Sequence, residues 1–158
     1  MRRGEYAILL AEDDENDIVL TKRAFKKAGL DSKLFIVRNG EEAIKYLAGE
    51  GAYADREKHP LPNLVITDLK MPKKNGADLI HWIRDNPHLR GLQVFVLSSV
   101  QDKERANPAV EANAYLRKSA DGDELQEMVK GLATFVEELQ SSLQKSSISF
   151  AELHENED

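Results

Sequence analysis

Five short apolar runs divide the chain, and longer segments with apolar residues at helical spacing separate them. The runs occupy residues 6–11, 34–37, 64–67, 93–97 and 114–117. Runs this brief and this apolar are typical of strands buried on both faces of a parallel sheet. Strands that alternate with amphipathic segments indicate an α/β fold, in which helices cover both faces of a doubly wound, five-stranded sheet.

Amphipathic helices are predicted at four places, namely residues 17–28, 41–47, 77–86 and from about residue 121 onward. Asn16 or Asp17 is expected to cap the first of them, because short polar side chains accept hydrogen bonds from the first free amides of a helix. The last helix is long and has a continuous apolar stripe, formed by Leu125, Met128, Val129, Leu132, Val136, Leu139 and Leu143. One domain is therefore expected over residues 1–143, with a loop insertion at 49–63 and a polar, acidic tail at 144–158 that frays after Ser146.

Composition narrows the classes of function. The net charge of −6 argues against nucleic acid or a membrane surface as a non-specific partner. The chain has no cysteine, which excludes disulfides and thiolate metal sites. Its first residues lack the apolar stretch of a signal peptide, and no segment is long enough to span a bilayer, so a cytoplasmic location is expected.

Chemically useful side chains follow the predicted strands. Glu12 and Asp13 come after the first, Asp68 after the third, Ser98 after the fourth and Lys118 after the fifth. In an open α/β sheet, ligands bind in the crevice at the carboxyl ends of the strands. Carboxylates, a hydroxyl and an ammonium should therefore gather at one edge of the sheet, as a phosphoryl-transfer site requires.

These residues, in this order, resemble the receiver domain of two-component response regulators. The resemblance rests on the acids after the first strand, on Asp68 with the turn Met71-Pro72 to Gly76 downstream, on Ser98 and on Lys118. It covers about residues 7–139 and implies a flavodoxin-like sheet with strand order 2-1-3-4-5. The loop at residues 49–63 is similar to that of stand-alone receivers that partner phytochrome-type sensor kinases.

The resemblance implies that Asp68 accepts a phosphoryl group from a phosphohistidine, which is carried by a sensor histidine kinase or a histidine phosphotransfer protein. It also implies an Mg²⁺ site, with Asp13 and Asp68 as direct ligands, the backbone carbonyl of Lys70 as a third and Glu12 acting through water. Hard oxygen ligands suit this small, hard cation. Asp14, the next acid, is expected only to stabilise the positive end of the first helix.

Three further residues have implied roles. Lys118 is expected to contact the phosphoryl group as a compact cation, and Ser98 to donate a hydrogen bond to it. Tyr115, three residues before Lys118, matches the aromatic rotamer switch of this family. The chain is not expected to be an enzyme on other molecules, because it would catalyse only its own phosphoryl transfer and dephosphorylation.

The chain also departs from the family pattern. Pro108 falls where the family has a helix, and a proline inside a helix costs about 3 kcal/mol, so a short or broken helix is expected within residues 101–113. Lys118 precedes Ser119 instead of the usual proline, and a trans bond is predicted there. Lys70 and Val100 occupy positions that tune the lifetime of the acyl phosphate, and we expect a lifetime of minutes or longer.

Other interpretations follow from the same residues. A dehalogenase-type phosphatase needs a second aspartate two positions after Asp68, where this chain has Lys70, and a nucleotide-binding fold needs glycines after the first strand. An interaction module that works without phosphorylation stays open, as does a phosphate relay in place of a diffusible regulator. A homodimer is expected through the face formed by residues 101–113, residues 114–117 and the final helix.

Overall fold

The computed structural model describes residues 6–99, 111–119 and 121–155, and for residues 143–155 the helix backbone. Its strands form one parallel sheet in the order β2-β1-β3-β4-β5. The strand bounds are β1 Ile8–Ala11, β2 Leu34–Val37, β3 Leu64–Asp68, β4 Gln93–Ser98 and β5 Ala114–Arg117. The helix bounds are α1 Glu15–Lys27, α2 Gly40–Ala48, α3 Gly76–Asp85 and α4 Asp123–Glu155. This is the doubly wound, flavodoxin-like order that the sequence predicts.

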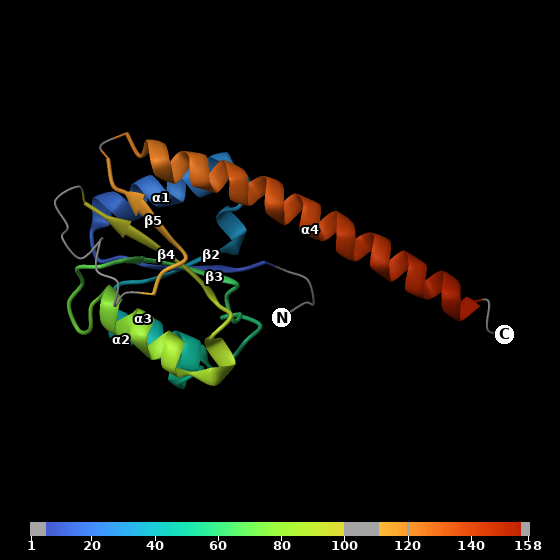
Figure 1. Ribbon diagram of the computed structural model, residues 1–158, viewed down its shortest axis with the longest axis horizontal. Coiled ribbons are helices and arrows are strands. Elements are labelled where there is room, and N and C mark those ends of the chain that lie inside the picture. The colour runs from blue at the N-terminus through green and yellow to red at the C-terminus, as the bar shows by residue number, and fades with distance from the viewer. Residues whose placement is uncertain (1–5, 100–110, 120, 156–158) are drawn as a thin grey trace.

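The sheet separates two hydrophobic cores. Figure 1 shows α1 and α4 on one face of the sheet and α2 and α3 on the other. Successive residues of a strand point to opposite faces, so Leu9 of β1 packs in the core under α2 and α3, whereas Ile8 and Leu10 pack in the core under α1 and α4. All four residues of β1 are buried, because this central strand has helices on both sides.

The first helix begins earlier than expected. Asp14 is its N-cap, since the Asp14 side chain accepts a hydrogen bond from the backbone amide of Asp17, and the helix starts at Glu15. The prediction that Asn16 or Asp17 caps this helix is therefore wrong, whereas the stabilising role expected for Asp14 is confirmed. The correction matters for function, because it leaves the Asp17 carboxylate free for a tertiary contact.

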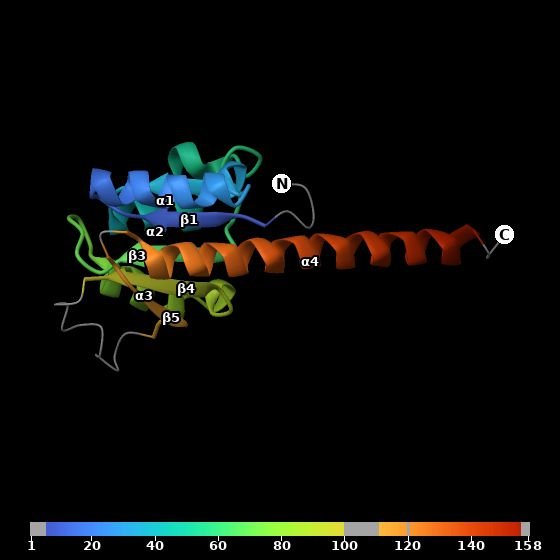
Figure 2. The same ribbon diagram turned by 90° about the horizontal axis from the view of Figure 1, so that it is seen from above.

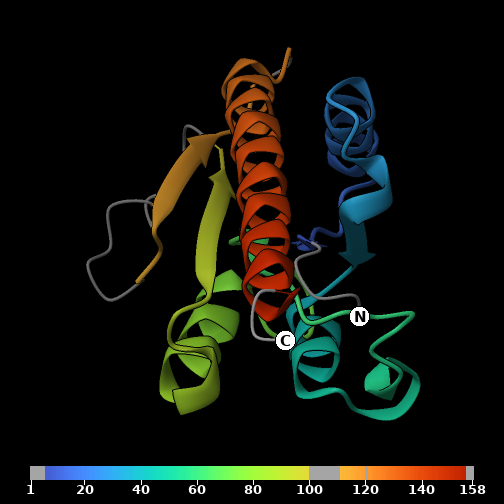
Figure 3. The ribbon, with the colours of Figure 1, turned by 90° about the vertical axis from the view of Figure 1, so that its right-hand side faces the viewer.

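Helix α4 is much longer than the domain needs. It continues to Glu155, so the expectation of a frayed tail after residue 146 is wrong for its secondary structure. The buried residues of its stripe are Leu125, Val129, Leu132 and Val136, which pack against the sheet and α1. Figures 1 and 2 show the C-terminal part of α4 projecting beyond the sheet. Figure 3 shows its domain-facing turns between α1 and the strands β4 and β5.

The segment from α2 to β3 contains a short 3-10 helix, Gly51–Ala54. Arg56 connects this segment to the end of α2. The guanidinium of Arg56 donates hydrogen bonds to the carbonyl oxygens of Tyr46 (2.8 Å), Leu47 (2.9 Å) and His59 (3.2 Å). Two of these carbonyls lie in the last turn of α2, where the regular helical hydrogen bonds end, although the Tyr46 carbonyl also accepts a 3.1 Å hydrogen bond from the Gly49 amide. The expected loop insertion is thus an ordered structure. Within the described residues, no helix combines the length and the apolar character that a bilayer crossing would need.

Candidate functional site

Strand register brings the predicted site residues to one edge of the sheet. Asp68 is the last residue of β3 and pairs with Leu97 of β4, next to Ser98. Ser98 in turn pairs with Arg117, the last residue of β5, and the Lys118 amide donates a 2.7 Å hydrogen bond to the Ser98 carbonyl. On the other side, Ala11 of β1 pairs with Thr67, so the acids that follow β1 reach the level of Asp68. Four strand ends therefore meet in one crevice.

Glu12, Asp13 and Asp68 form an acid cluster in which carboxylate oxygens from all three lie within 4.8 Å of one another. Glu12 is fully buried, Asp13 is exposed and the Asp68 side chain is 13% exposed. Three carboxylates this close repel one another unless a cation lies between them. Their oxygens are the ligand type that Mg²⁺, Mn²⁺ or Ca²⁺ prefers, so the residues present fit a divalent cation.

Lys118 is the protein's own cation at this cluster. Its Nζ atom lies 2.9 Å from Glu12 Oε2, 3.1 Å from Asp68 Oδ2 and 2.8 Å from Asp17 Oδ2. The ammonium donates hydrogen bonds to Glu12 and Asp17, and its contact with Asp68 is an ion pair. The Lys118 side chain is only 20% exposed, so these contacts are better shielded from water than surface ion pairs are.

The charges of Glu12 and Lys118 depend on each other. Burial raises the pKa of the Glu12 carboxyl to about 7, and the Asp68 charge adds to the increase while Lys118 opposes it. Burial by itself would lower the pKa of the Lys118 ammonium, but the carboxylates of Asp17, Glu12 and Asp68 outweigh it and raise the pKa overall. Lys118 is therefore a permanent cation, whereas Glu12 takes up a proton more readily than an ordinary carboxylate, even with the ammonium beside it favouring its charged form.

Ser98 has an unused hydrogen-bonding group in the crevice. Its side chain is fully buried, and within the described part of the chain its Oγ atom has no hydrogen-bond partner. A buried hydroxyl without a partner costs free energy, of the order of 1–3 kcal/mol. This hydroxyl lies at a strand end beside Asp68, so it can donate a hydrogen bond to an oxygen of a ligand bound in the crevice.

The turn after Asp68 requires a glycine. A Cβ atom on Gly76 would overlap the carbonyl oxygen of Asp68, while the Gly76 amide donates a 2.9 Å hydrogen bond to the Leu69 carbonyl. The start of α3 therefore lies directly against the backbone of Asp68. Lys73 and Lys74, within this turn, both have positive φ angles (48° and 73°), a conformation that is rare for residues with a side chain.

The strained turn is held by the start of α2. The carbonyl oxygens of Lys73 and Lys74 accept hydrogen bonds from the amides of Glu41 (2.8 Å) and Gly40 (3.0 Å), which are among the unpaired amides at the start of α2. A Cβ atom on Gly40 would overlap the Lys74 carbonyl, so both glycines are needed for close approach of backbone. The turn beside Asp68 is thus fixed from two helices.

The roles of the remaining predicted residues stay predictions. Lys70 and Asp13 line one open pocket of about 370 Å³, beside the acid cluster, and the Lys70 carbonyl stays a predicted ligand. Tyr115 lies in β5, half-buried against the core under α2 and α3, and its switch role stays a prediction. Val100 and Pro108 lie outside the described residues, as does most of the segment 101–113.

The bond between Lys118 and Ser119 is trans as predicted, since the described parts of the chain contain no cis peptide bond. The structure also gives Ser119 a function that a proline would lack. Its hydroxyl accepts a 3.3 Å hydrogen bond from the Asp123 amide, and its carbonyl accepts one from the Gly122 amide at 3.1 Å. Ser119 therefore helps to start α4 directly after the site lysine.

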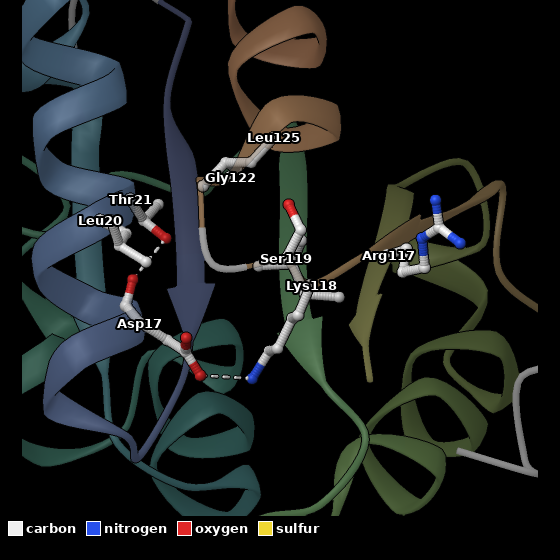
Figure 4. A pocket seen from close by; sticks show the side chains of 9 residues that line it. Asp17, Leu20, Thr21, Arg117, Lys118, Ser119, Gly122 and Leu125 are labelled. Carbon is white, nitrogen blue, oxygen red and sulfur yellow. Dashed lines mark hydrogen bonds and ion pairs between the residues drawn. The ribbon is translucent and has the colours of Figure 1, made fainter. Parts of the chain in front are cut away.

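Asp17 is the site residue that sequence reasoning missed. It lies in the first turn of α1, and Figure 4 shows its carboxylate in contact with the Lys118 ammonium beside a small pocket that both residues line. Nothing in the sequence pattern sets Asp17 apart from the other polar residues in the first turn of the helix. The contact joins residues 101 positions apart.

A family model described as the response regulator receiver domain matches residues 8–130, which is most of the chain. The chain belongs to the response regulator receiver domain family. Two curated relatives agree with this. Response regulator Rcp1 from Synechocystis sp. is 35% identical over 130 residues, which are 81% of this chain and 86% of the relative. The probable methanogenesis regulatory protein FilR2 from Methanothrix harundinacea is 30% identical and covers 82% of this chain and 83% of its own.

Solved receiver structures share the fold over most of their length. The phosphorylated cyanobacterial phytochrome response regulator RcpA is 33% identical, with a TM-score of 0.71 over 83% of this chain and 93% of that one. The Mn²⁺-bound form of response regulator Rcp1 is 34% identical, with a TM-score of 0.69 over 83% and 94%. Response regulator RPA3017, from red light signalling of R. palustris, is 30% identical with a TM-score of 0.72 over 83% and 93%. The predicted receiver fold and family are confirmed.

Proposed function

We propose that this receiver takes a phosphoryl group onto Asp68 from a phosphohistidine, carried by a sensor histidine kinase or a histidine phosphotransfer protein. The observation that supports this most strongly is the convergence at one sheet edge of Asp68, two further acids, Lys118 and the Ser98 hydroxyl, which has no partner in the described part of the chain. A carboxylate nucleophile, a cation and a spare donor are the three parts that phosphoryl transfer needs.

In the proposed reaction a carboxylate oxygen of Asp68 attacks the phosphorus atom. A new O–P bond forms, the P–N bond to the histidine ring breaks, and its electron pair stays on the ring nitrogen. The product is an acyl phosphate on Asp68. The protein contributes mainly by aligning the two reacting groups and by neutralising the charge on the phosphoryl oxygens.

Charge neutralisation divides among the residues of the crevice. Glu12, Asp13, Asp68 and the Lys70 carbonyl would hold Mg²⁺, which supplies positive charge beside the phosphoryl oxygens when it is bound. The Lys118 ammonium, already 3.1 Å from Asp68, supplies the second positive charge. Ser98 donates its O–H, which has no partner within the described residues, to a phosphoryl oxygen. We propose that this contact, together with Tyr115, carries the switch.

The donor that we propose is a phytochrome-type sensor histidine kinase. The support comes from relatives, since the names of several similar structures refer to phytochrome or bacteriophytochrome response regulators. The chain would act in the cytoplasm and catalyse only its own phosphorylation and dephosphorylation. The same site could serve a diffusible regulator, which acts on a target, or a relay, which passes the phosphoryl group on to a histidine.

We also propose a homodimer that involves β5 and α4. Helix α4 projects beyond the sheet (Figure 1), and Phe135, in its middle, is 50% exposed although its ring contacts Tyr6 edge-on with centroids 5.8 Å apart. Segment 101–113, which completes the expected face, lies mostly outside the described residues. A molar mass of one chain by light scattering, with and without phosphorylation, would count against this dimer.

The function is tested by incubation with acetyl phosphate, with and without Mg²⁺, followed by intact mass measurement of wild type and Asp68→Asn. We expect wild type to gain one phosphoryl group in Mg²⁺ and none in its absence. Asp68→Asn should gain none under either condition, because an amide is no nucleophile for this reaction. Wild type that stays unmodified would support the interaction module that works without phosphorylation.

A further inference from the structure

Asp17 differs from the other two carboxylates that contact Lys118. Glu12 and Asp68 belong to the acid cluster that fits a divalent cation, whereas Asp17 does not. Asp17 nevertheless makes the shortest of the three contacts, 2.8 Å from Oδ2 to the Lys118 Nζ atom. It also comes from a helix, α1, and not from a strand end. Figure 4 shows the two side chains meeting between α1 and the segment after β5.

The position of Asp17 is fixed by its own backbone. Its amide donates a 3.0 Å hydrogen bond to the N-cap carboxylate of Asp14, and its carbonyl accepts a 2.8 Å hydrogen bond from the Thr21 hydroxyl. Thr21 is buried against the core, so this turn of α1 cannot shift without breaking packing. The carboxylate therefore approaches Lys118 from a rigid element, as a positioning group should.

The three contacts of Lys118 compete with one another. An ammonium has three donors, and Asp17 takes one of them away from the acid cluster. Without Asp17, that donor would turn to the remaining oxygens of Glu12 and Asp68, which a cation needs as ligands.

We propose that Asp17 is a positioning residue that acts through Lys118. It draws the ammonium toward α1 and thereby keeps oxygens of Glu12 and Asp68 available to a divalent cation before phosphorylation. The proposal rests on the proposed function, because it assumes that this cluster binds Mg²⁺. It assigns the carboxylate of Asp17 to the control of cation affinity and not to the chemical step.

The test is the Mg²⁺ dissociation constant, measured by calorimetric titration of the full chain. Asp17→Asn keeps the shape of the side chain and removes its charge, and we expect about fivefold weaker binding. Asp17→Glu keeps the charge and should recover most of the affinity. Glu15→Gln is the matched control, because Glu15 lies in the same turn but pairs with Arg38 at 2.6 Å, away from Lys118. We expect it to stay within about twofold of wild type, since an exposed charge is screened.

Two further measurements separate positioning from a structural effect. With acetyl phosphate as donor, Asp17→Asn should raise the Mg²⁺ concentration for half-maximal phosphorylation by the same factor, with a smaller change in the maximal rate. In a Lys118→Met background, Asp17→Asn should weaken Mg²⁺ binding no more than Glu15→Gln does, because the lysine through which it acts is gone. If Asp17→Asn does not fold, Asp17→Ser replaces it in the same comparisons.

Equal Mg²⁺ affinity of wild type and Asp17→Asn would overturn the proposal. So would an equal loss in Glu15→Gln, or an undiminished loss in the Lys118→Met background, since both indicate general electrostatics. These outcomes differ from a failure of the proposed function. In that case wild type itself would take up no phosphoryl group from acetyl phosphate in Mg²⁺.

Discussion

Two half-buried cations of this protein, Arg56 and Lys118, each have three oxygen partners, but of different kinds. The partners of Arg56 are backbone carbonyls, two of them in the last turn of α2. The partners of Lys118 are carboxylates, two of them in a cluster that fits a divalent cation. Backbone carbonyls are fixed in place by the fold, whereas the carboxylates can also bind a divalent cation. The same local arrangement is therefore structural at Arg56 and exchangeable at Lys118.

The largest effect on stability is expected at Arg56. Arg56→Met leaves three carbonyls without their charged donor, and we expect the free energy of unfolding to fall by about 2 kcal/mol. Urea denaturation measures this, and phosphorylation by acetyl phosphate should stay as in wild type. Arg56→Lys is the control, because a lysine keeps the charge but lacks the planar fork, so part of the loss should persist. A loss of phosphorylation in folded Arg56→Met would break the comparison.

A smaller and conditional effect is expected at Lys118. In the absence of divalent cations, Lys118→Met leaves clustered carboxylates unpaired, and the free energy of unfolding should fall by about 1–2 kcal/mol, less than for a fully buried pair. Mg²⁺ should restore that stability, because it binds the folded state preferentially. Lys130→Met, which removes an exposed pair with Glu127, should change nothing measurable in either condition. If Mg²⁺ left the free energy of unfolding of Lys118→Met unchanged, a divalent cation could not replace the lysine at these carboxylates, which would contradict the comparison.

The smallest effect on stability is expected at Ser98. Ser98→Ala removes a buried hydroxyl that has no partner within the described chain, so the free energy of unfolding should stay unchanged or rise by up to about 1 kcal/mol. The phosphorylated fraction at equilibrium with acetyl phosphate should nevertheless fall. Ser99→Ala, at the exposed next position, serves as the control and should affect neither quantity. A clear loss of stability in Ser98→Ala would show that its hydroxyl is already paired.

The sheet and the acid cluster were predictable for one physical reason. Buried parallel strands appear in the sequence as short apolar runs, and the residues that follow them lie at one edge of the sheet. The sequence therefore predicts that Asp68, Ser98 and Lys118 lie close together. The confirmed strand order follows from the same alternation of strands and helices. Periodicity fixes such features because each of them lies within one element or at its end.

Contacts between distant elements could not be predicted in this way. Asp17 was a candidate cap of the first helix, and only the packing of α1 beside the segment after β5 brings it to Lys118. Arg56 looked like a charged loop residue, although it closes the end of α2. The end of α4 was expected to fray because it is polar, yet nothing after Ser146 is a glycine or proline that would stop the helix.

The most direct measurement is to locate the phosphoryl group by mass spectrometry. Wild-type protein is phosphorylated in Mg²⁺ by a phytochrome-type sensor kinase that carries its phosphohistidine, then reduced with borohydride, which converts an aspartyl phosphate to homoserine, and digested. We predict homoserine at position 68 and nowhere else. Reduction at Asp13 or Asp14 instead, or an unmodified chain beside a kinase that keeps its label, would contradict the account.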